Sequence, residues 1–196
     1  MSIEIGNLFP IPVGMDKYPN ANDIKQTLVP KFKEQEKLVE CNTYYPGGYT
    51  SYGSDESILQ WNECSDLVKF ITNSVTDVHA GCGLSGDVNL QNSWFSINRK
   101  HALHENHMHL PSTWSGVYYV QCDGDAPGLT FINKHLESGW PYCQADTLGD
   151  YSSNSCTVQP STGSIIIFPS YFTHKVEQQR TDNERISIAF NFGVSL

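Results

Sequence analysis

Hydrophobic positions recur at helical spacing in the first part of the chain. Within residues 21–39, Ile24, Leu28 and Phe32 follow one another every four residues, which is the spacing of one helical face. Pro30 lies inside this segment and should kink or split the helix, because proline lacks the N–H that a helical carbonyl needs. A second stripe predicts a helix over residues 65–80 and consists of Val68, Ile71, Val75 and Val78.

Two other segments of this region lack helical periodicity. Residues 8–13 contain two prolines and are expected to form an edge strand at best, since proline cannot donate to a β-ladder. Residues 41–54 include Pro46-Gly47-Gly48 and are expected to form a loop.

After Gly86 the pattern changes to short β-prone runs that are separated by turn residues. The predicted strands are 94–98, 116–121, 129–132, 156–158, 164–168 and 185–192. Helices followed by strands favour an antiparallel sandwich with the helices on one outer face.

The last predicted strand has two different faces. One face is apolar and consists of Ile186, Ile188, Phe190 and Phe192. The alternate positions are occupied by Arg185, Ser187, Ala189 and Asn191. A strand with one helix-covered face and one polar interior face produces this alternation, so we expect the helix at 65–80 to cover the apolar face.

Length and charge limit the class of protein. The 196 residues are enough for one domain with a substantial core, and we expect a single domain over 1–196, with a helical lead-in over 1–85 and a β core over 86–196. Lys and Arg number 12 against 21 Asp and Glu, giving a formal net charge of −9. This balance argues against nucleic acid or an anionic membrane as the main partner. The oligomeric state is left open.

The first residues lack both a basic n-region and a long apolar run. We therefore expect neither a signal peptide nor a membrane span. The six cysteines are spread out without a Cys-x-x-Cys pair, which favours reduced thiols in a cytoplasm.

The candidate chemistry is concentrated in the segment from His104 to His109, which reads His-Glu-Asn-His-Met-His. If this segment is a strand, His107 and His109 lie two residues apart and share a face with Glu105. Two imidazoles on one face can bind iron, zinc, copper or nickel, but they need at least one further ligand. The best candidate for that ligand is His174, which follows a Phe-Pro turn.

Several motifs occur together in a fixed order. They are Leu8-Phe9-Pro10, His107-Met108-His109, Ser115-Gly116-Val117-Tyr118-Tyr119, Gly128-Leu129-Thr130-Phe131, a Gly-x-x-x-x-Phe-Pro-Ser over 163–170, and Arg185-Ile186-Ser187 with Asn191. In this order the chain resembles the Fe(II)- and 2-oxoglutarate-dependent oxygenases, and specifically a small family of them in phages and marine bacteria. The resemblance spans most of residues 92–192 and implies a double-stranded β-helix (a jelly roll, cupin-like), mostly β with N-terminal helices.

The resemblance also implies a cofactor, a cosubstrate and an activity. Fe(II) would be bound by His107, His109 and His174, and 2-oxoglutarate would be the cosubstrate. Arg185 offers a planar fork for the far carboxylate of 2-oxoglutarate, Ser187 on the same strand face can donate a further hydrogen bond, and the resemblance places Tyr119 to do so too. The implied activity is a dioxygenase, in particular a hydroxylase of an unidentified substrate, that releases succinate and CO2.

The chain departs from the usual family pattern at one ligand. The usual triad is two histidines and a carboxylate placed two residues after the first histidine, and that position here is His109. Glu105 is the alternative carboxylate ligand, and Asp123 and Asp125 are poorer candidates in an expected turn. Three-histidine iron sites do occur in related β-barrels.

Two other functions stay open from the sequence alone. One is a cupin-like three-histidine dioxygenase without 2-oxoglutarate, which would have no use for Arg185 and Ser187. The other is a non-enzymatic β-sandwich binding module. The substrate mouth is expected to be formed by loops 41–54 and 133–155.

The remaining histidines and the tryptophans are interpreted as packing or surface residues. The histidines are His79, His101, His104 and His135. The tryptophans are Trp61, Trp94, Trp114 and Trp140, of which Trp114 is the candidate for lining the mouth because it lies near the metal strand.

Overall fold

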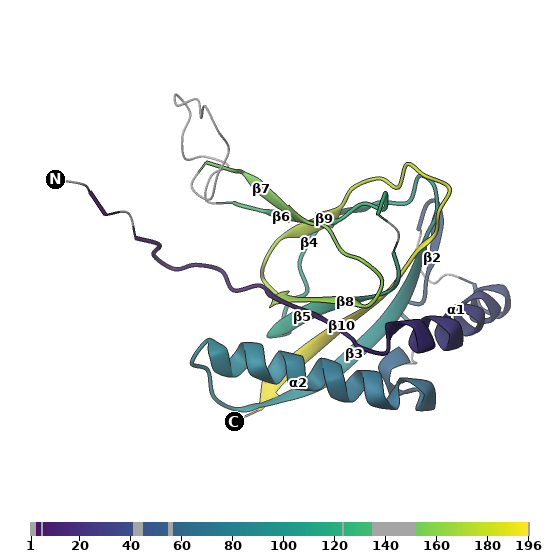
Figure 1. Ribbon diagram of the computed structural model, residues 1–196, viewed down its shortest axis with the longest axis horizontal. Helices are drawn as coiled ribbons and strands as arrows, with labels where there is room; N and C mark the ends of the chain where they lie inside the picture. The colour runs from purple at the N-terminus through teal and green to yellow at the C-terminus, as the bar shows by residue number, and fades with distance from the viewer. Residues whose placement is uncertain are drawn as a thin grey trace.

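The computed structural model describes residues 3–4, 6–40, 45–54, 57–122, 124–134 and 152–195. Two antiparallel sheets lie one above the other (Figure 1). The larger sheet contains β1 (Gly14–Lys17), β2 (Gly48–Thr50), β3 (Asp87–Asn98), β5 (Trp114–Gln121), β8 (Ser164–Pro169) and β10 (Arg185–Ser195). The smaller sheet contains β4 (His104–His107), β6 (Leu129–Ile132), β7 (Ser155–Val158) and β9 (His174–Val176).

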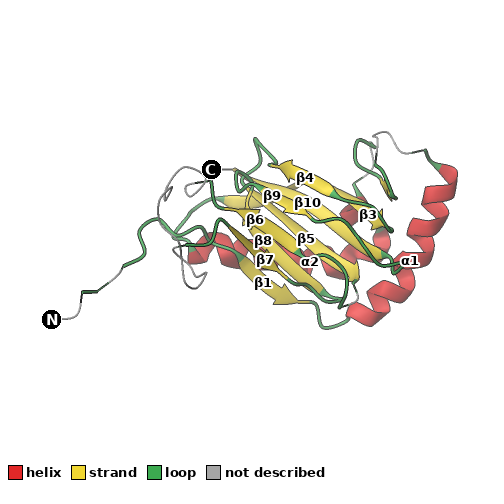
Figure 2. Cartoon of the chain, turned by 90° about the horizontal axis from the view of Figure 1, so that it is seen from above, coloured by secondary structure: helices red, strands yellow, loops and turns green. Residues whose placement is uncertain are grey.

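The helices lie on the outer face of the larger sheet (Figures 1 and 2). They are α1 (Ala21–Leu38) and α2 (Ser65–Gly81), and α2 is preceded by two short 3-10 turns, η1 (Ile58–Gln60) and η2 (Asn62–Cys64). Neither described helix combines the length and the apolar character needed to cross a bilayer.

The order of the strands confirms the expected fold. The larger sheet runs β1-β8-β5-β10-β3-β2, and the smaller sheet runs β4-β9-β6-β7. From β3 onward the chain passes back and forth between the two sheets, and each strand pairs with its neighbours in antiparallel register. This winding is that of a double-stranded β-helix, or jelly roll.

All six strands that the sequence predicts occur in the structure, and β4 covers part of the segment 104–109 that was considered as a strand. Among the described strands, β1, β2 and β9 do not follow from the sequence. β1, β2, β4 and β9 contain three or four residues each. β2 lies inside the segment 41–54, which was expected to be a loop, and residues 8–13 form no strand because the edge of the sheet is β1. β1 and β2 pair with the longer strands β8 and β3, whereas β4 and β9 pair with each other and β9 also pairs with β6, so all four depend on pairing with distant segments.

Pro30 was expected to kink or split the first helix; it does not split it, because α1 is one continuous element through Pro30. Proline deprives the carbonyl four residues earlier, that of Gln26, of its helical donor. Both Pro30 and Gln26 face solvent, where water is available to that carbonyl.

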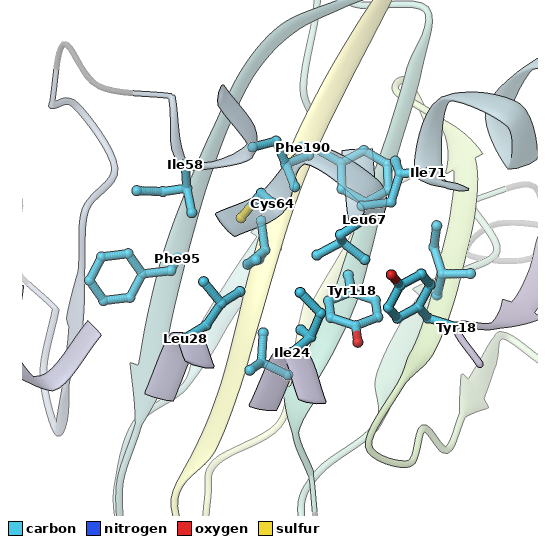
Figure 3. Close-up of a cluster of buried hydrophobic side chains, with 14 of the residues drawn as sticks. Tyr18, Ile24, Leu28, Ile58, Cys64, Leu67, Ile71, Phe95, Tyr118 and Phe190 are labelled. Carbon is cyan, nitrogen blue, oxygen red and sulfur yellow. The ribbon is translucent and has the colours of Figure 1, made fainter. Parts of the chain in front are cut away.

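The main core lies between the helices and β10. Ile186, Ile188, Phe190 and Phe192 are all at most 1% exposed. They belong to one apolar cluster with Leu28 and Phe32 of α1 and with Leu67, Ile71 and Val75 of α2, part of which is drawn in Figure 3. The expectation that the helix at 65–80 covers this face is confirmed, and α1 shares in the covering.

A buried polar contact crosses this core. The indole N–H of Trp114 donates to Nδ1 of His79 at 3.0 Å, and Nε2 of His79 lies 3.1 Å from the carbonyl oxygen of Ser85. His79 is therefore a packing residue with both ring nitrogens engaged. Trp114 is 2% exposed in this layer, so the idea that it lines the substrate mouth is wrong.

Ile188→Ala tests this packing. Removing the side chain deletes buried methyl groups between β10 and the helices, so the free energy of unfolding should fall by about 2–5 kcal/mol. Urea denaturation measures the change. Met15→Ala in β1 is the matched control, because Met15 is 66% exposed in the same sheet and its loss should change stability by less than about 0.5 kcal/mol. Equal effects in the two variants would contradict the layered arrangement.

Candidate active site

Two histidines meet where β4 and β9 pair. His107 is the last residue of β4, His174 is the first residue of β9, and they are direct partners in the antiparallel register. Side chains of direct partners lie on the same face of a sheet. The two imidazole rings accordingly lie with their centroids 4.2 Å apart.

His109 reaches the same place by a different route. β4 ends at His107, so His109 lies in the turn beyond it and not on a continued strand, as had been expected. The backbone N–H of His109 donates to the carbonyl of Ser170 at 2.9 Å, which fixes the turn against the end of β8. Nε2 of His109 then lies 3.3 Å from Nε2 of His174.

The three histidines form a group that can hold a metal ion. One ligand nitrogen from each of His107, His109 and His174 lies within 4.8 Å of the other two. Within the described ranges Glu105 and Asp125 do not join this group, and Asp123 lies outside the described residues. The backbone carbonyl of Glu105 contributes in another way, since it accepts a hydrogen bond from His107.

Backbone carbonyls determine which ring nitrogens are available. Nδ1 of His107 lies 2.7 Å from the carbonyl of Glu105, and Nδ1 of His174 lies 2.8 Å from the carbonyl of Phe172. A carbonyl only accepts, so each Nδ1 carries the proton and each Nε2 keeps its lone pair. A second hydrogen bond of this kind is the usual way in which a metal-binding imidazole is oriented.

The protonation states also suit a metal. Burial, together with the neighbouring His107, lowers the pKa of His174 to about 3 and that of His109 to about 4. Both rings are therefore neutral near pH 7, as a metal ligand must be. A set of three imidazoles suits first-row metals such as Fe(II), so the residues present fit an iron site.

Arg185 lies in the interior, and no acidic side chain of the described residues pairs with it. This first residue of β10 is 3% exposed. Its Nη2 donates to the hydroxyl of Tyr119 at 3.3 Å, and its Nη1 lies 3.5 Å from the hydroxyl of Ser187. An uncompensated buried cation is costly, and an anionic ligand would remove that cost.

Tyr119 and Ser187 are placed by strand register. They are direct partners across β5 and β10, so both side chains lie on the interior face. The guanidinium carbon of Arg185 lies 4.8 Å from the centroid of the Tyr119 ring. Burial raises the pKa of Tyr119, which keeps its hydroxyl protonated and able to donate.

A cavity of about 590 Å³ opens beside the histidines. Its lining includes residues 103–109 on one side and Tyr45, Thr50, Tyr52 and Trp94 on the other. The expected mouth loop 41–54 thus contributes to it, whereas most of the second expected loop, 133–155, lies outside the described residues.

Trp94 was interpreted from sequence as a packing residue, yet it forms a wall of the cavity. Its ring packs against Tyr52 at 4.9 Å and against His109 at 5.7 Å, measured between centroids. No local signal in the sequence distinguishes it from Trp114, which is buried under the helices. Trp140 and His135 lie outside the described residues.

His104 is a second cavity residue that the sequence reasoning missed. His104 pairs with Val176 and His107 with His174, so three steps along β4 correspond to two along β9. This bulge lets both histidines line the cavity, although residues three apart on a regular strand face opposite ways. Burial, aided by the neighbouring His107, lowers the pKa of His104 to about 3.

Comparison with known proteins was made on sequence and on structure. A family model described as "Putative 2OG-Fe(II) oxygenase" matches residues 92–191. A search of curated proteins gave no match.

Solved structures share the fold at low identity. A prolyl-4-hydroxylase from Pseudomonas putida aligns with 16% identity and a TM-score of 0.63, covering 95% of this chain and 94% of its own. The α-ketoglutarate-dependent epimerase SnoN from nogalamycin biosynthesis aligns with 12% identity and a TM-score of 0.60, covering 92% of this chain and 78% of its own. A prolyl hydroxylase from Trichoplax adhaerens, in complex with a hypoxia inducible factor peptide fragment, aligns with 12% identity and a TM-score of 0.59. The alignment covers 93% of this chain and 83% of its own.

The family match covers the part of the chain that holds the site. His107, His109, His174, Arg185 and Ser187 all lie within residues 92–191, as does Tyr119. The strand order and the likeness to solved structures agree on the double-stranded β-helix. The chain belongs to the family of 2OG-Fe(II) oxygenases that this model describes.

Proposed function

We propose that this protein is an Fe(II)- and 2-oxoglutarate-dependent dioxygenase that hydroxylates its substrate and releases succinate and CO2. The observation that carries the proposal is the pairing of two features in one interior. Three imidazoles converge within 4.8 Å, and the buried Arg185 on β10 of the other sheet has no anionic partner among the described residues. The first suits a metal, and the second suits the far end of a dicarboxylate.

His107, His109 and His174 would hold the iron through Nε2. The oxidising chemistry comes from the bound iron, 2-oxoglutarate and dioxygen, and the protein contributes positioning and exclusion of water. Two of the three ligands are already oriented by backbone carbonyls, so little reorganisation is needed when metal binds. The neutral state of His109 and His174 means that they need not lose protons on binding near pH 7.

Arg185, Ser187 and Tyr119 would bind the distal carboxylate of 2-oxoglutarate. The guanidinium offers two parallel N–H donors to a carboxylate, and the two hydroxyls can each donate one more. A monocarboxylic keto-acid would leave the buried cation unpaired. The pocket therefore favours a diacid over a shorter or uncharged ligand.

The primary substrate would enter through the cavity whose wall includes Trp94 and Tyr52. Hydroxylation is proposed as the reaction because two of the similar solved structures are prolyl hydroxylases. SnoN, an epimerase, represents the alternative outcome on the same fold. These proteins share at most 16% identity with this chain, so the likeness concerns the fold and does not identify the substrate.

A three-histidine dioxygenase that does not use 2-oxoglutarate is the second candidate. The replacement of a carboxylate ligand by His109 favours it. The buried guanidinium of Arg185, which has no anionic partner among the described residues, argues against it, because that enzyme would have no anion to place there.

The ligand set is tested by substituting each histidine. His107→Ala, His109→Ala and His174→Ala should each abolish stoichiometric Fe(II) binding, because a two-imidazole remnant holds a divalent ion weakly. Glu105→Gln is the matched control and should keep full occupancy, since its carboxylate is not in the group. Metal analysis after anaerobic loading measures occupancy. Loss in Glu105→Gln with retention in His109→Ala would restore a two-histidine, one-carboxylate site.

The role of Arg185 is tested by Arg185→Gln. It should weaken 2-oxoglutarate binding by at least about 2 kcal/mol, roughly thirtyfold, because a buried charge pair loses its cation. Mn(II) binding should be unchanged, since no imidazole is altered. Arg180→Gln is the control, as Arg180 is an exposed arginine of the same segment. Anaerobic calorimetry on Mn(II)-loaded protein decides, and failure of the unmutated protein to bind 2-oxoglutarate would reject the proposed function.

The stability of the metal-free protein should depend on pH. The pKa values of His104, His109 and His174 are lowered from 6.5 to about 3, 4 and 3. Between pH 6.5 and about 4 the unfolded chain binds more protons than the folded one, so the free energy of unfolding falls as the pH falls. Urea unfolding in the presence of a chelator, at pH 7.5, 6.5 and 5.5, measures this change in the free energy of unfolding.

His174→Gln serves as the comparison for this pH dependence. It removes one buried imidazole and should give a shallower decline between pH 6.5 and 5.5. An identical slope in the two proteins would show that the histidine cluster is not the origin of the pH dependence.

A further inference from the structure

Asn98 lies directly beside Arg185 in the interior. It is the last residue of β3 and is 0% exposed. In the antiparallel register of β3 and β10, Asn98 and Arg185 are direct partners. Their side chains therefore lie on the same face of the sheet, which is the interior face that Tyr119 and Ser187 also occupy.

The two ends of the Asn98 amide differ in their surroundings. Its oxygen Oδ1 accepts a hydrogen bond from the hydroxyl of Tyr45 at 3.0 Å. Its nitrogen Nδ2 has no hydrogen-bond partner in the part of the chain that the structure describes, and neither has Nε of Arg185. A buried donor left unpaired costs free energy, and native proteins pair nearly all of them.

Both unpaired groups are donors, so the group missing between them is an acceptor. One of the two donors belongs to a cation, which makes an anionic acceptor the favoured one. A carboxylate has about four lone-pair sites and can accept from several donors at once. We propose that Asn98 is a further cosubstrate-binding residue, whose Nδ2 donates to the distal carboxylate of 2-oxoglutarate alongside Arg185. This inference rests on the proposed function.

Tyr45 is a positioning residue in this arrangement. Its hydroxyl occupies the oxygen end of the Asn98 amide and so directs Nδ2 away from itself. Its ring packs edge-on against His104 at 4.8 Å, and Tyr45 also lines the cavity of the candidate active site. The hydrogen bond from Tyr45 to Asn98 thus connects the cavity to the proposed carboxylate site around Arg185.

Asn98→Leu removes the donor while keeping a side chain of similar volume. The Mn(II)-loaded variant should bind 2-oxoglutarate about tenfold or more weakly, the loss expected for one hydrogen bond to a charged group. Its affinity for Mn(II) alone should be unchanged. Tyr45→Phe should weaken 2-oxoglutarate binding by a smaller factor, because it removes the hydrogen bond that orients the Asn98 amide but keeps the amide itself. Anaerobic calorimetry measures all of these affinities.

Asn98→Asp separates a ligand-binding role from a structural one. The variant keeps an acceptor for Tyr45 but places a carboxylate oxygen where the donor was, beside Arg185. It should weaken 2-oxoglutarate binding more than Asn98→Leu does, while the melting temperature of the ligand-free protein stays the same or rises. A purely structural role would instead make affinity and stability fall together.

Asn92→Leu is the matched control. Asn92 lies on the same strand, and its Oδ1 accepts from Nδ2 of Asn191 at 2.8 Å, so its amide is engaged six residues from Asn98. The 2-oxoglutarate affinity of this variant should stay within about twofold of the unmutated protein, as for a site remote from the ligand.

A structure of the Mn(II) and 2-oxoglutarate complex gives the direct result. Nδ2 of Asn98 should lie within hydrogen-bond distance of the distal carboxylate, about 2.7–3.2 Å. An amide with Oδ1 turned toward the guanidinium, or an Asn98→Leu variant that binds within twofold of the unmutated protein, would overturn the role of Asn98. If the unmutated Mn(II)-loaded protein itself fails to bind 2-oxoglutarate, the proposed function falls, and this outcome is distinct from the other two.

Discussion

The alternation of side chains along β10 is the constraint on which the rest of this structure depends. β10 pairs with β3 on one side and β5 on the other, so it lies inside the larger sheet. One of its faces carries four large apolar side chains against the helices. A slip of one residue would turn that face toward the interior and Arg185 toward the helices. Burial of the apolar face therefore fixes the register that places Arg185 and Ser187 on the interior face.

The two arginines near the end of β3 show how differently the same side chain can be used. Arg99 forms a bidentate pair with Glu36 of α1, at 2.6 and 2.7 Å, and also contacts Glu184 at 3.0 Å. It connects α1 to the segment that enters β10. Within the described residues, the guanidinium of Arg185, the residue after Glu184, donates to the hydroxyl groups of Tyr119 and Ser187 and to no carboxylate. The charge of Arg99 is neutralised by acidic side chains, whereas that of Arg185 has no acidic partner among the described residues, as the proposed binding of 2-oxoglutarate requires.

The proposed site has a net positive charge before 2-oxoglutarate binds. Three imidazoles add no negative charge to a divalent metal, unlike a set that includes a carboxylate. The two carboxylates of 2-oxoglutarate would then be the principal counter-charges to both the metal and Arg185. Electrostatic attraction in a buried site is stronger than in water, so occupancy of the two positions should be strongly coupled. Asn98 adds a neutral donor and leaves this balance unchanged.

The sequence by itself determined the elements with long or strongly periodic patterns. The helical stripes, the six predicted β-prone runs and the two faces of residues 185–192 follow from the local spacing of residue types, which does not depend on contacts with distant segments. The ordered motifs pointed to the family, and the alternation Arg185-x-Ser187 put two polar side chains on one interior face.

Only the tertiary structure decided how the site is assembled. The short strands β4 and β9 exist because they pair with each other and β9 with β6, and the bulge between them brings His104 to the cavity. His109 reaches His174 through a turn fixed by Ser170. The position of the Asn98 amide nitrogen beside Arg185, with no hydrogen-bond partner among the described residues, is visible only once β3 and β10 are in register. Bulges, short pairings and unsatisfied donors arise from hydrogen bonds between distant segments, and local sequence patterns do not encode them.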